Sequence, residues 1–294
     1  MIPFNTLAQV RSPDGSMITL HEHDGEHYIK HNGRQLMSTI ATVSEYLLAD
    51  LGCRELKGMP APRVLIGGLG LGFTLKRVLE LVGEKAVVHV SELLPEMVQW
   101  NREFLAAVNG KLLQDPRVEV LVQDVFKVMN DLKGERYDAI LLDVDHTPAS
   151  WVQEKNFRLY ERAGFDAVHR ALDPHGLVAY WSAGEEPEFV HRLGRAGFHV
   201  QSYEAKAHAH AKRAVHRIYL GSPKTRQVET STQAQKPAAR NSQSSNKSPR
   251  PSGTSGRRRQ KPKEARHPFV SPQQAAGLER KARRIQESKG ASRR

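Results

Sequence analysis

Long apolar runs are absent from this sequence, and so is a second cysteine. No stretch approaches the roughly 20 apolar residues that a bilayer-spanning helix needs, so no membrane partner is expected. Residues 1–14 lack the apolar core of a secretory signal. Cys53 has no cysteine with which to form an internal disulfide. These absences together predict a protein of the reducing cytoplasm.

The basic charge is concentrated at the carboxyl end. The chain has 44 Lys+Arg against 32 Asp+Glu. Residues 223–294 hold 19 Lys+Arg and 4 Asp+Glu, a net charge of +15, so residues 1–222 hold 25 and 28, a net charge of −3. The same segment is rich in Ser, Pro and Gln, and Phe269 is its one aromatic residue. Such a composition cannot bury enough apolar surface to offset chain entropy. We expect a disordered basic tail over 223–294, with a short helix at 272–287.

Two functions are compatible with this tail. Its charge would attract polyanions through counterion release, so nucleic acid bound without sequence preference is the candidate partner. A disordered extension that only keeps the protein soluble would have the same composition. The sequence leaves both interpretations open.

Two turn dipeptides, Asp24-Gly25 and Asn32-Gly33, separate short extended runs near the amino terminus. Such dipeptides adopt the positive φ values that match the twist of a β-hairpin. The three runs are Met17–His23, Glu26–Lys30 and Arg34–Met37. We therefore expect residues 1–52 to form a three-stranded β-meander followed by a helix over Ser38–Leu51.

From Pro62 onward, short apolar runs alternate with amphipathic segments. Continuous Val, Ile and Leu runs indicate strands covered on both faces, as in parallel sheets. Strands are expected at Arg63–Ile66, Ala86–Ser91, Val118–Val122, Tyr137–Asp143 and Gly176–Trp181, and an antiparallel edge pair at Phe198–Tyr203 and Ala214–Leu220. Helices are expected at Gly72–Leu81, Pro95–Val108, Phe157–Leu172 and Pro187–Ala196. Residues 53–222 are thus predicted to be an α/β domain with a doubly wound, mostly parallel, seven-stranded Rossmann-like sheet.

The first of these strands runs into a glycine-rich turn, after which a helix begins. Glycines there allow a tight turn and let a ligand approach bare backbone and the N–H groups of the helix N-terminus. Gly68, Gly70 and Gly72 have the spacing G-x-G-x-G, whereas the nicotinamide-type fingerprint is G-x-G-x-x-G. The spacing resembles that of the S-adenosylmethionine-binding class, so we interpret the three glycines as cofactor-binding. A glycine turn without a ligand is the alternative.

Acidic residues follow the next strands of the expected sheet. Ligands of open α/β sheets bind beyond the carboxyl ends of the strands, so these acids should face the glycine turn. Glu92 ends the second strand and is expected to accept the ribose hydroxyls, although an acid also suits the start of the following helix. Asp124 follows the third strand and can either accept from the adenine amino group or cap the next helix.

Asp143, at the end of the fourth strand, is the predicted catalytic residue. A carboxylate there attracts an ammonium group and can accept the proton that an amine of pKa near 10 must lose before its nitrogen attacks. Asp145 is a candidate for substrate binding, with turn capping as its simpler role. Histidines gather in the hairpin region, but no cysteine or clustered acid completes a ligand set, so no metal is expected.

Several of these segments resemble the spermidine synthases, over about residues 15–220 of this chain. The resemblance is carried by the meander and by residues Val64–Val78, Val90–Asn101, Gln123–Phe126 and Tyr137–Pro148. It implies a class I methyltransferase-type fold and transfer of an aminopropyl group from decarboxylated S-adenosylmethionine to a polyamine amine. It also implies that Asp143 is the catalytic aspartate, Glu92 the ribose ligand and Asp124 the adenine ligand.

One position of the glycine loop departs from the pattern of that family. The family's Gly-Gly-Gly-Asp-Gly-Gly loop has an aspartate that holds the donor ammonium, and Leu71 stands at the aligned position. Two alternatives therefore stay open. The domain could transfer a methyl group from S-adenosylmethionine to an undetermined acceptor, or it could be a non-catalytic nucleotide-binding domain that its tail tethers to nucleic acid. The oligomeric state is open as well, with a homodimer as the candidate.

Overall fold

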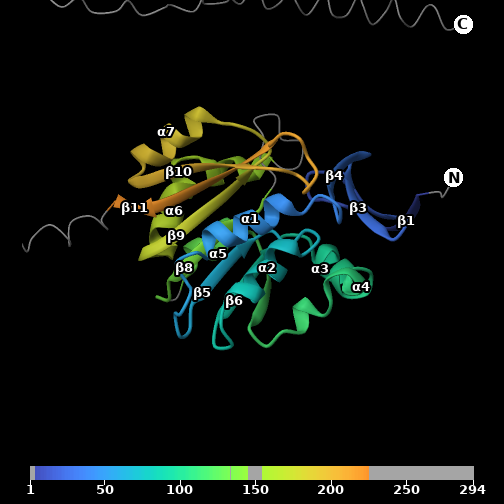
Figure 1. Cartoon of the computed structure of the whole chain (residues 1–294), viewed down its shortest axis with the longest axis horizontal. Helices are drawn as coiled ribbons and strands as arrows, with labels where there is room; N and C mark the ends of the chain where they lie inside the picture. Colours follow the sequence, from blue (N-terminus) through green and yellow to red (C-terminus); the bar gives the residue numbers. More distant parts are fainter. Residues whose placement is uncertain (1–3, 133, 145–153, 225–294) are drawn as a thin grey trace, which may run out of the picture. The chain divides into compact units, whose positions relative to one another are not determined.

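The computed structural model describes residues 4–132, 134–144 and 154–224 (Figure 1). Asp145, nearly all of the expected tail and its helix at 272–287 lie outside these residues, so what the sequence predicts for them stays a prediction. None of the described helices is both long and apolar enough to cross a membrane.

The amino-terminal sheet is an antiparallel meander in the order β1-β2-β3-β4. Its strands are β1 (Asn5–Arg11), β2 (Met17–His23), β3 (Glu26–His31) and β4 (Arg34–Ser38). Asp24 and Asn32 have φ values of 53° and 48°, as the turn dipeptides predict. The expectation of three strands is wrong by one, because β1 also pairs with β2. β1 is an edge strand whose residues are exposed or only half-buried, so its sequence has no strong apolar alternation.

The second sheet has the strand order β10-β11-β9-β8-β5-β6-β7. Its strands are β5 (Arg63–Gly67), β6 (Val87–Glu92), β7 (Val118–Val122), β8 (Tyr137–Leu142), β9 (Leu172–Ser182), β10 (Phe198–Ala205) and β11 (His216–Pro223). Strands β5 to β9 are parallel, and β10 and β11 form an antiparallel pair beside β9. This confirms the predicted doubly wound sheet. Its strand order reverses between β5 and β8, which is where such sheets open a ligand crevice.

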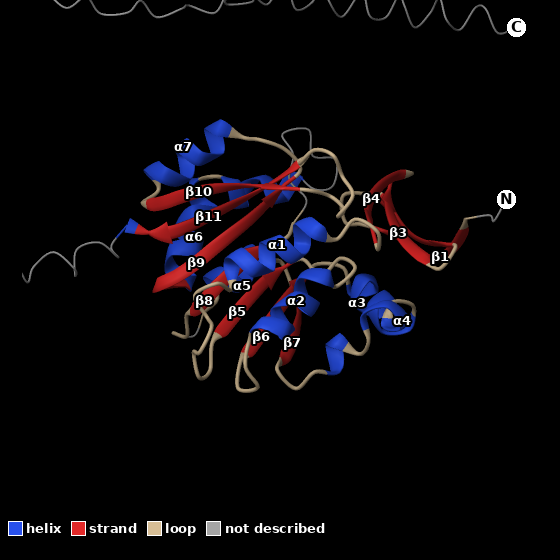
Figure 2. Cartoon of the chain, in the orientation of Figure 1, coloured by secondary structure: helices blue, strands red, loops and turns tan. Residues whose placement is uncertain are grey.

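Helices cover both faces of the seven-stranded sheet (Figure 2). The helices are α1 (Val43–Gly52), α2 (Phe73–Leu81), α3 (Pro95–Glu103), α4 (Ala106–Asn109), α5 (Val125–Asn130), α6 (Arg162–Ala171) and α7 (Pro187–Arg195), with 3₁₀ turns η1 (Leu112–Gln114) and η2 (Glu154–Tyr160). Helices α1, α2 and α3 pack on one face, and α5, α6 and α7 on the other. The single helices expected over 95–108 and 157–172 are each divided in two, because the chain leaves helical geometry after Glu103 and after Tyr160.

A third apolar cluster joins the meander to the larger sheet's helices. Ile18, Leu20 and Ile29 of the meander pack with Leu71 and with residues of α3. Leu71 is only 3% exposed. Leu71 is therefore part of the apolar contact between the meander and the glycine turn.

Candidate active site

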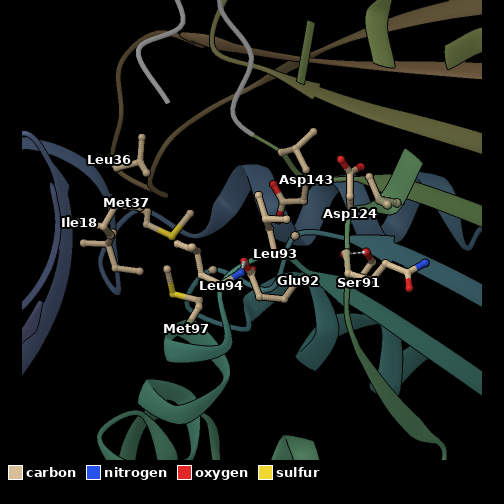
Figure 3. Close-up of a pocket in the computed structure, with 16 residues that line it drawn as sticks. Ile18, Leu36, Met37, Ser91, Glu92, Leu93, Leu94, Met97, Asp124 and Asp143 are labelled. Carbon is tan, nitrogen blue, oxygen red and sulfur yellow. Dashed lines mark hydrogen bonds between the residues drawn. The ribbon is translucent and has the colours of Figure 1, made fainter. Parts of the chain in front are cut away.

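A cavity opens at the carboxyl ends of the parallel strands, beside the meander (Figure 3). Its empty space amounts to about 780 Å³, part of which is open solvent. Five of the predicted site residues line it: Gly68, Gly70, Glu92, Asp124 and Asp143. Folding thus brings together at one cavity groups that are far apart in the sequence.

The glycine turn between β5 and α2 has a backbone that favours glycine. Gly68, Gly70 and Gly72 have φ values of 95°, 49° and 88°. A side chain at Gly68 would also collide with the carbonyl oxygen of Asp143, and one at Gly70 would come within 2.9 Å of the Met37 side chain. Gly72 does not line the cavity. It is the N-cap of α2, with the side chain of Asn101 beside it, so its position has a structural explanation.

Glu92 is held at the end of β6 by backbone N–H groups. Its Oε2 accepts a hydrogen bond from Leu69 N at 3.0 Å, and its Oε1 accepts one from Leu94 N at 2.9 Å. The carboxylate thereby links the glycine turn to the loop before α3. Burial raises the pKa of Glu92, and the backbone hydrogen bonds oppose that rise. The backbone N–H groups of Leu93 and Gly70 also lower that pKa, so backbone donors surround much of the carboxylate.

Asp124 caps α5, which is one of the two roles that the sequence leaves open. Its Oδ1 accepts from Phe126 N at 2.8 Å. Its Oδ2 forms an ion pair with Arg158 of η2, whose guanidinium lies 4.3 Å from the centroid of the Phe126 ring. No local sequence signal indicates Arg158, since it lies 34 residues along the chain from its partner. A carboxylate with two partners can still accept another hydrogen bond, so the adenine role remains chemically open.

Asp143 directly follows β8 and is attached to the glycine turn. Its N–H donates to the carbonyl of Gly67 at 2.9 Å, and Thr74 Oγ1 donates to its Oδ2 at 2.6 Å. Burial raises the pKa of Asp143 to about 6, and the Thr74 hydrogen bond opposes the rise. No basic side chain among the described residues contributes to that pKa. Asp143 is therefore a buried carboxylate on which no basic side chain of the described residues acts.

The rest of the cavity wall is mostly apolar, with Ser91 and Gln123 as its polar residues. Its apolar residues include Ile18, Ile29, Leu36, Met37, Leu94 and Met97. Four of these come from the meander, for which the sequence predicts strands but no place in the site. Alternation along β2 and β3 identifies their inward residues, but not the ligand cavity that those residues face. Leu71 lies in the apolar cluster behind this wall and does not line the cavity.

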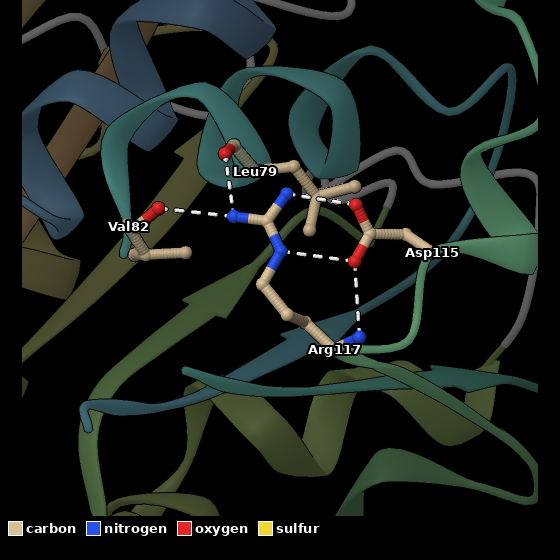
Figure 4. Close-up of polar contacts among 4 residues, drawn as sticks. All are labelled: Leu79, Val82, Asp115 and Arg117. Carbon is tan, nitrogen blue, oxygen red and sulfur yellow. Dashed lines mark hydrogen bonds and ion pairs between the residues drawn. The ribbon is translucent and has the colours of Figure 1, made fainter. Parts of the chain in front are cut away.

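A second polar cluster, away from the cavity, is structural (Figure 4). The Arg117 guanidinium binds the Asp115 carboxylate at 2.7 and 2.9 Å and donates to the carbonyls of Leu79 and Val82 at 2.9 and 3.0 Å. These carbonyls belong to the carboxyl end of α2, where helical partners are lacking. Arg117 therefore fastens α2 to the start of β7. Among the described residues, no group of three or more His, Cys, Asp and Glu could hold a metal ion.

A cavity beside the reversal point of a sheet with this strand order is the arrangement of class I methyltransferase-type domains. A family model for the spermine/spermidine synthase domain matches residues 48–196. The chain belongs to the spermine/spermidine synthase family.

Individual relatives agree with this assignment. The polyamine aminopropyltransferase of Pyrobaculum calidifontis is 32% identical over 122 residues, which cover 40% of this chain and 41% of the relative. Putrescine N-methyltransferase 2 of Nicotiana attenuata is 32% identical over 124 residues, which cover 42% of this chain and 32% of the relative. The chain thus spans less than half the length of these curated relatives.

Solved structures confirm the fold. The crystal structure of spermidine synthase from Thermotoga maritima aligns with a TM-score of 0.58 at 19% identity, covering 75% of this chain and 73% of that one. A spermidine synthase in complex with the transition state analogue AdoDATO aligns with a TM-score of 0.57 at 18% identity, covering 75% and 72%.

Proposed function

We propose that this protein is an aminopropyltransferase that uses decarboxylated S-adenosylmethionine as donor and a polyamine amine as acceptor. The observation that carries the proposal is the position of Asp143, which lines the same cavity as Glu92 and the glycine turn in a member of this family. The aminopropyltransferase relative supports the same transferred group.

The donor is held by the residues at the ends of β5 and β6. In this proposal its ribose hydroxyls donate to Glu92, its adenine lies toward Asp124, and its sulfonium faces Asp143. The glycines leave the backbone open to close approach. The sulfonium is already an activated leaving group, so the protein chiefly positions the reactants and excludes water.

The acceptor is activated by Asp143. Its carboxylate attracts the ammonium form of the amine and accepts its proton, which leaves a neutral nitrogen with a lone pair. That nitrogen attacks the carbon next to the sulfonium, so a C–N bond forms as the C–S bond breaks and the sulfur leaves as a neutral thioether. A pKa of about 6 keeps Asp143 ionised at neutral pH and makes it a better base than an ordinary aspartate. Asp145, next to it in sequence, is proposed to help hold the acceptor.

The choice of donor tests the proposal directly. We expect isothermal titration calorimetry to show tighter binding of decarboxylated S-adenosylmethionine than of S-adenosylmethionine, and mass spectrometry to show an aminopropylated product from putrescine. The comparison of the two donors is informative because Leu71 stands where the resemblance places the aspartate that would hold the donor ammonium. Preference for the carboxylated donor together with a methylated product would overturn aminopropyl transfer. Binding of neither donor would exclude both transferase functions.

We further propose that the basic tail binds polyanions such as RNA through charge alone. Its net charge of +15 over residues 223–294 supports this. Retention of the full chain on an RNA column should fall steeply as salt rises, because binding releases counterions. Removing residues 225–294, which keeps β11 complete, should abolish retention and leave donor binding unchanged. Retention by the shortened chain would assign the contact to the folded part. A homodimer and a cytoplasmic location stay predictions.

A further inference from the structure

Thr74 connects the helix after the glycine turn to the proposed catalytic carboxylate. It lies in the first turn of α2 and is 3% exposed. Its Oγ1 donates to Asp143 Oδ2 at 2.6 Å, the length expected when a hydroxyl donates to an ionised carboxylate. A buried hydroxyl without this partner would be costly, so the bond fixes both side chains.

Two backbone contacts bring Asp143 to the same turn. The Asp143 N–H donates to Gly67 O at 2.9 Å, and its carbonyl oxygen lies where a side chain on Gly68 would be. These contacts fix the backbone position of Asp143, but they leave its side-chain torsion angles free. Thr74 is the described side chain that removes this freedom.

We propose that Thr74 is a positioning residue that holds Asp143 Oδ2 so that Oδ1 is the oxygen presented to the acceptor amine. The inference rests on the proposed function, because it assigns the acceptor to Asp143. It also implies that the glycine turn and the first turn of α2 act together as one rigid unit. The turn contacts the donor, and Thr74 in the helix orients Asp143, which accepts the proton of the acceptor amine.

The surroundings of Asp143 allow the effect of Thr74 to be measured separately. Among the described residues, the other titratable groups lining the cavity are Glu92 and Asp124. Both oxygens of Glu92 accept from backbone N–H groups, and Asp124 is engaged by its capping bond and by Arg158. A hydroxyl donor stabilises the ionised form of a carboxylate, so its loss should raise the pKa of Asp143.

The test replaces Thr74 with valine, which keeps the shape of the side chain and removes the hydroxyl. We expect the acidic limb of the pH–rate profile to move up by about one pH unit, and kcat on the plateau to fall by about tenfold with little change in the KM of the donor. Thr74→Ser restores a hydroxyl and should restore both. Thr19→Val is the matched control, because its hydroxyl contacts His21 on β2 and it does not line the cavity.

A titration that needs no turnover separates this inference from the proposed function. ¹³C NMR of labelled aspartate, assigned with Asp143→Asn, should show the pKa of Asp143 rising in Thr74→Val even if no aminopropyl product forms. If Thr74→Val does not fold, Thr74→Ala serves the same measurement. An unchanged pKa with an unchanged acidic limb, or the same loss in Thr74→Ser as in Thr74→Val, would overturn the role of Thr74.

Discussion

Replacing Asp143 with asparagine is expected to lower aminopropyl transfer by about 10²- to 10⁴-fold, the range that a positioned general base contributes. Asparagine is close in size to aspartate, but it carries no charge to attract the ammonium and cannot accept its proton. Calorimetry should show that donor affinity is nearly unchanged, because Glu92 and the glycine turn are intact. The rate is measured with saturating donor and putrescine.

The same variant should not lose stability, which distinguishes a catalytic group from a structural one. Burial raises the pKa of Asp143 to about 6, above its ordinary value of 3.8, so folding favours the protonated form. The ionised carboxylate therefore costs stability as the pH rises through that pKa, and asparagine removes this cost at neutral pH. Asp166→Asn is the control for both activity and stability, because Asp166 lies on α6 outside the cavity lining and its ion pair with Arg162 is a surface pair of small energy. Equal activity in Asp143→Asn and the parent would remove Asp143 from the mechanism.

Replacing Glu92 with glutamine should weaken binding of the donor substrate, which Asp143→Asn should leave nearly unchanged. The glutamine amide accepts hydrogen bonds only through its oxygen. Its NH₂ group would therefore face the N–H of Leu69 or Leu94, and that N–H would lose its acceptor. We expect donor affinity to weaken by about 10- to 100-fold and the free energy of unfolding to fall by about 1–3 kcal/mol, the size of a lost charge-assisted hydrogen bond. Calorimetry and urea denaturation measure the two quantities.

The pH dependence of donor binding gives Glu92 a separate signature. Since burial raises its pKa, the parent should begin to lose donor affinity at a higher pH than an ordinary glutamate would allow, as the solution is acidified. Glu92→Gln should lack this dependence. Glu103→Gln, at the exposed end of α3, should behave like the parent. A Glu92→Gln variant with parental donor affinity would show that the nucleotide lies elsewhere.

Much of the fold follows from the order of apolar runs. Residues in strands β5, β6 and β8 are mostly buried, and their Val, Ile and Leu content alone predicts a covered parallel sheet. The edge strand β1 and the ends of helical structure after Glu103 and Tyr160 cannot be predicted in this way. Their local sequences favour no single conformation, so contacts with distant segments decide which conformation they adopt.

Some residues of the candidate site can likewise be predicted from the sequence, and others cannot. The glycine turn, Glu92 and Asp143 can be found from sequence, because each stands at a strand end and all parallel strands end at one edge. Thr74 and Arg158 cannot be found this way, because their partners lie 69 and 34 residues away. The apolar wall from the meander also depends on how the two sheets pack.

By itself the sequence determined the α/β class, the glycine-rich turn and the acids at the strand ends, since these depend on local periodicity and on residues near one another in the chain. Only the tertiary structure decided that Leu71 lies behind the cavity wall, that Met37 lies over Gly70, and that Thr74 holds Asp143. These contacts join segments far apart in the chain, and packing, which acts through space, selects them.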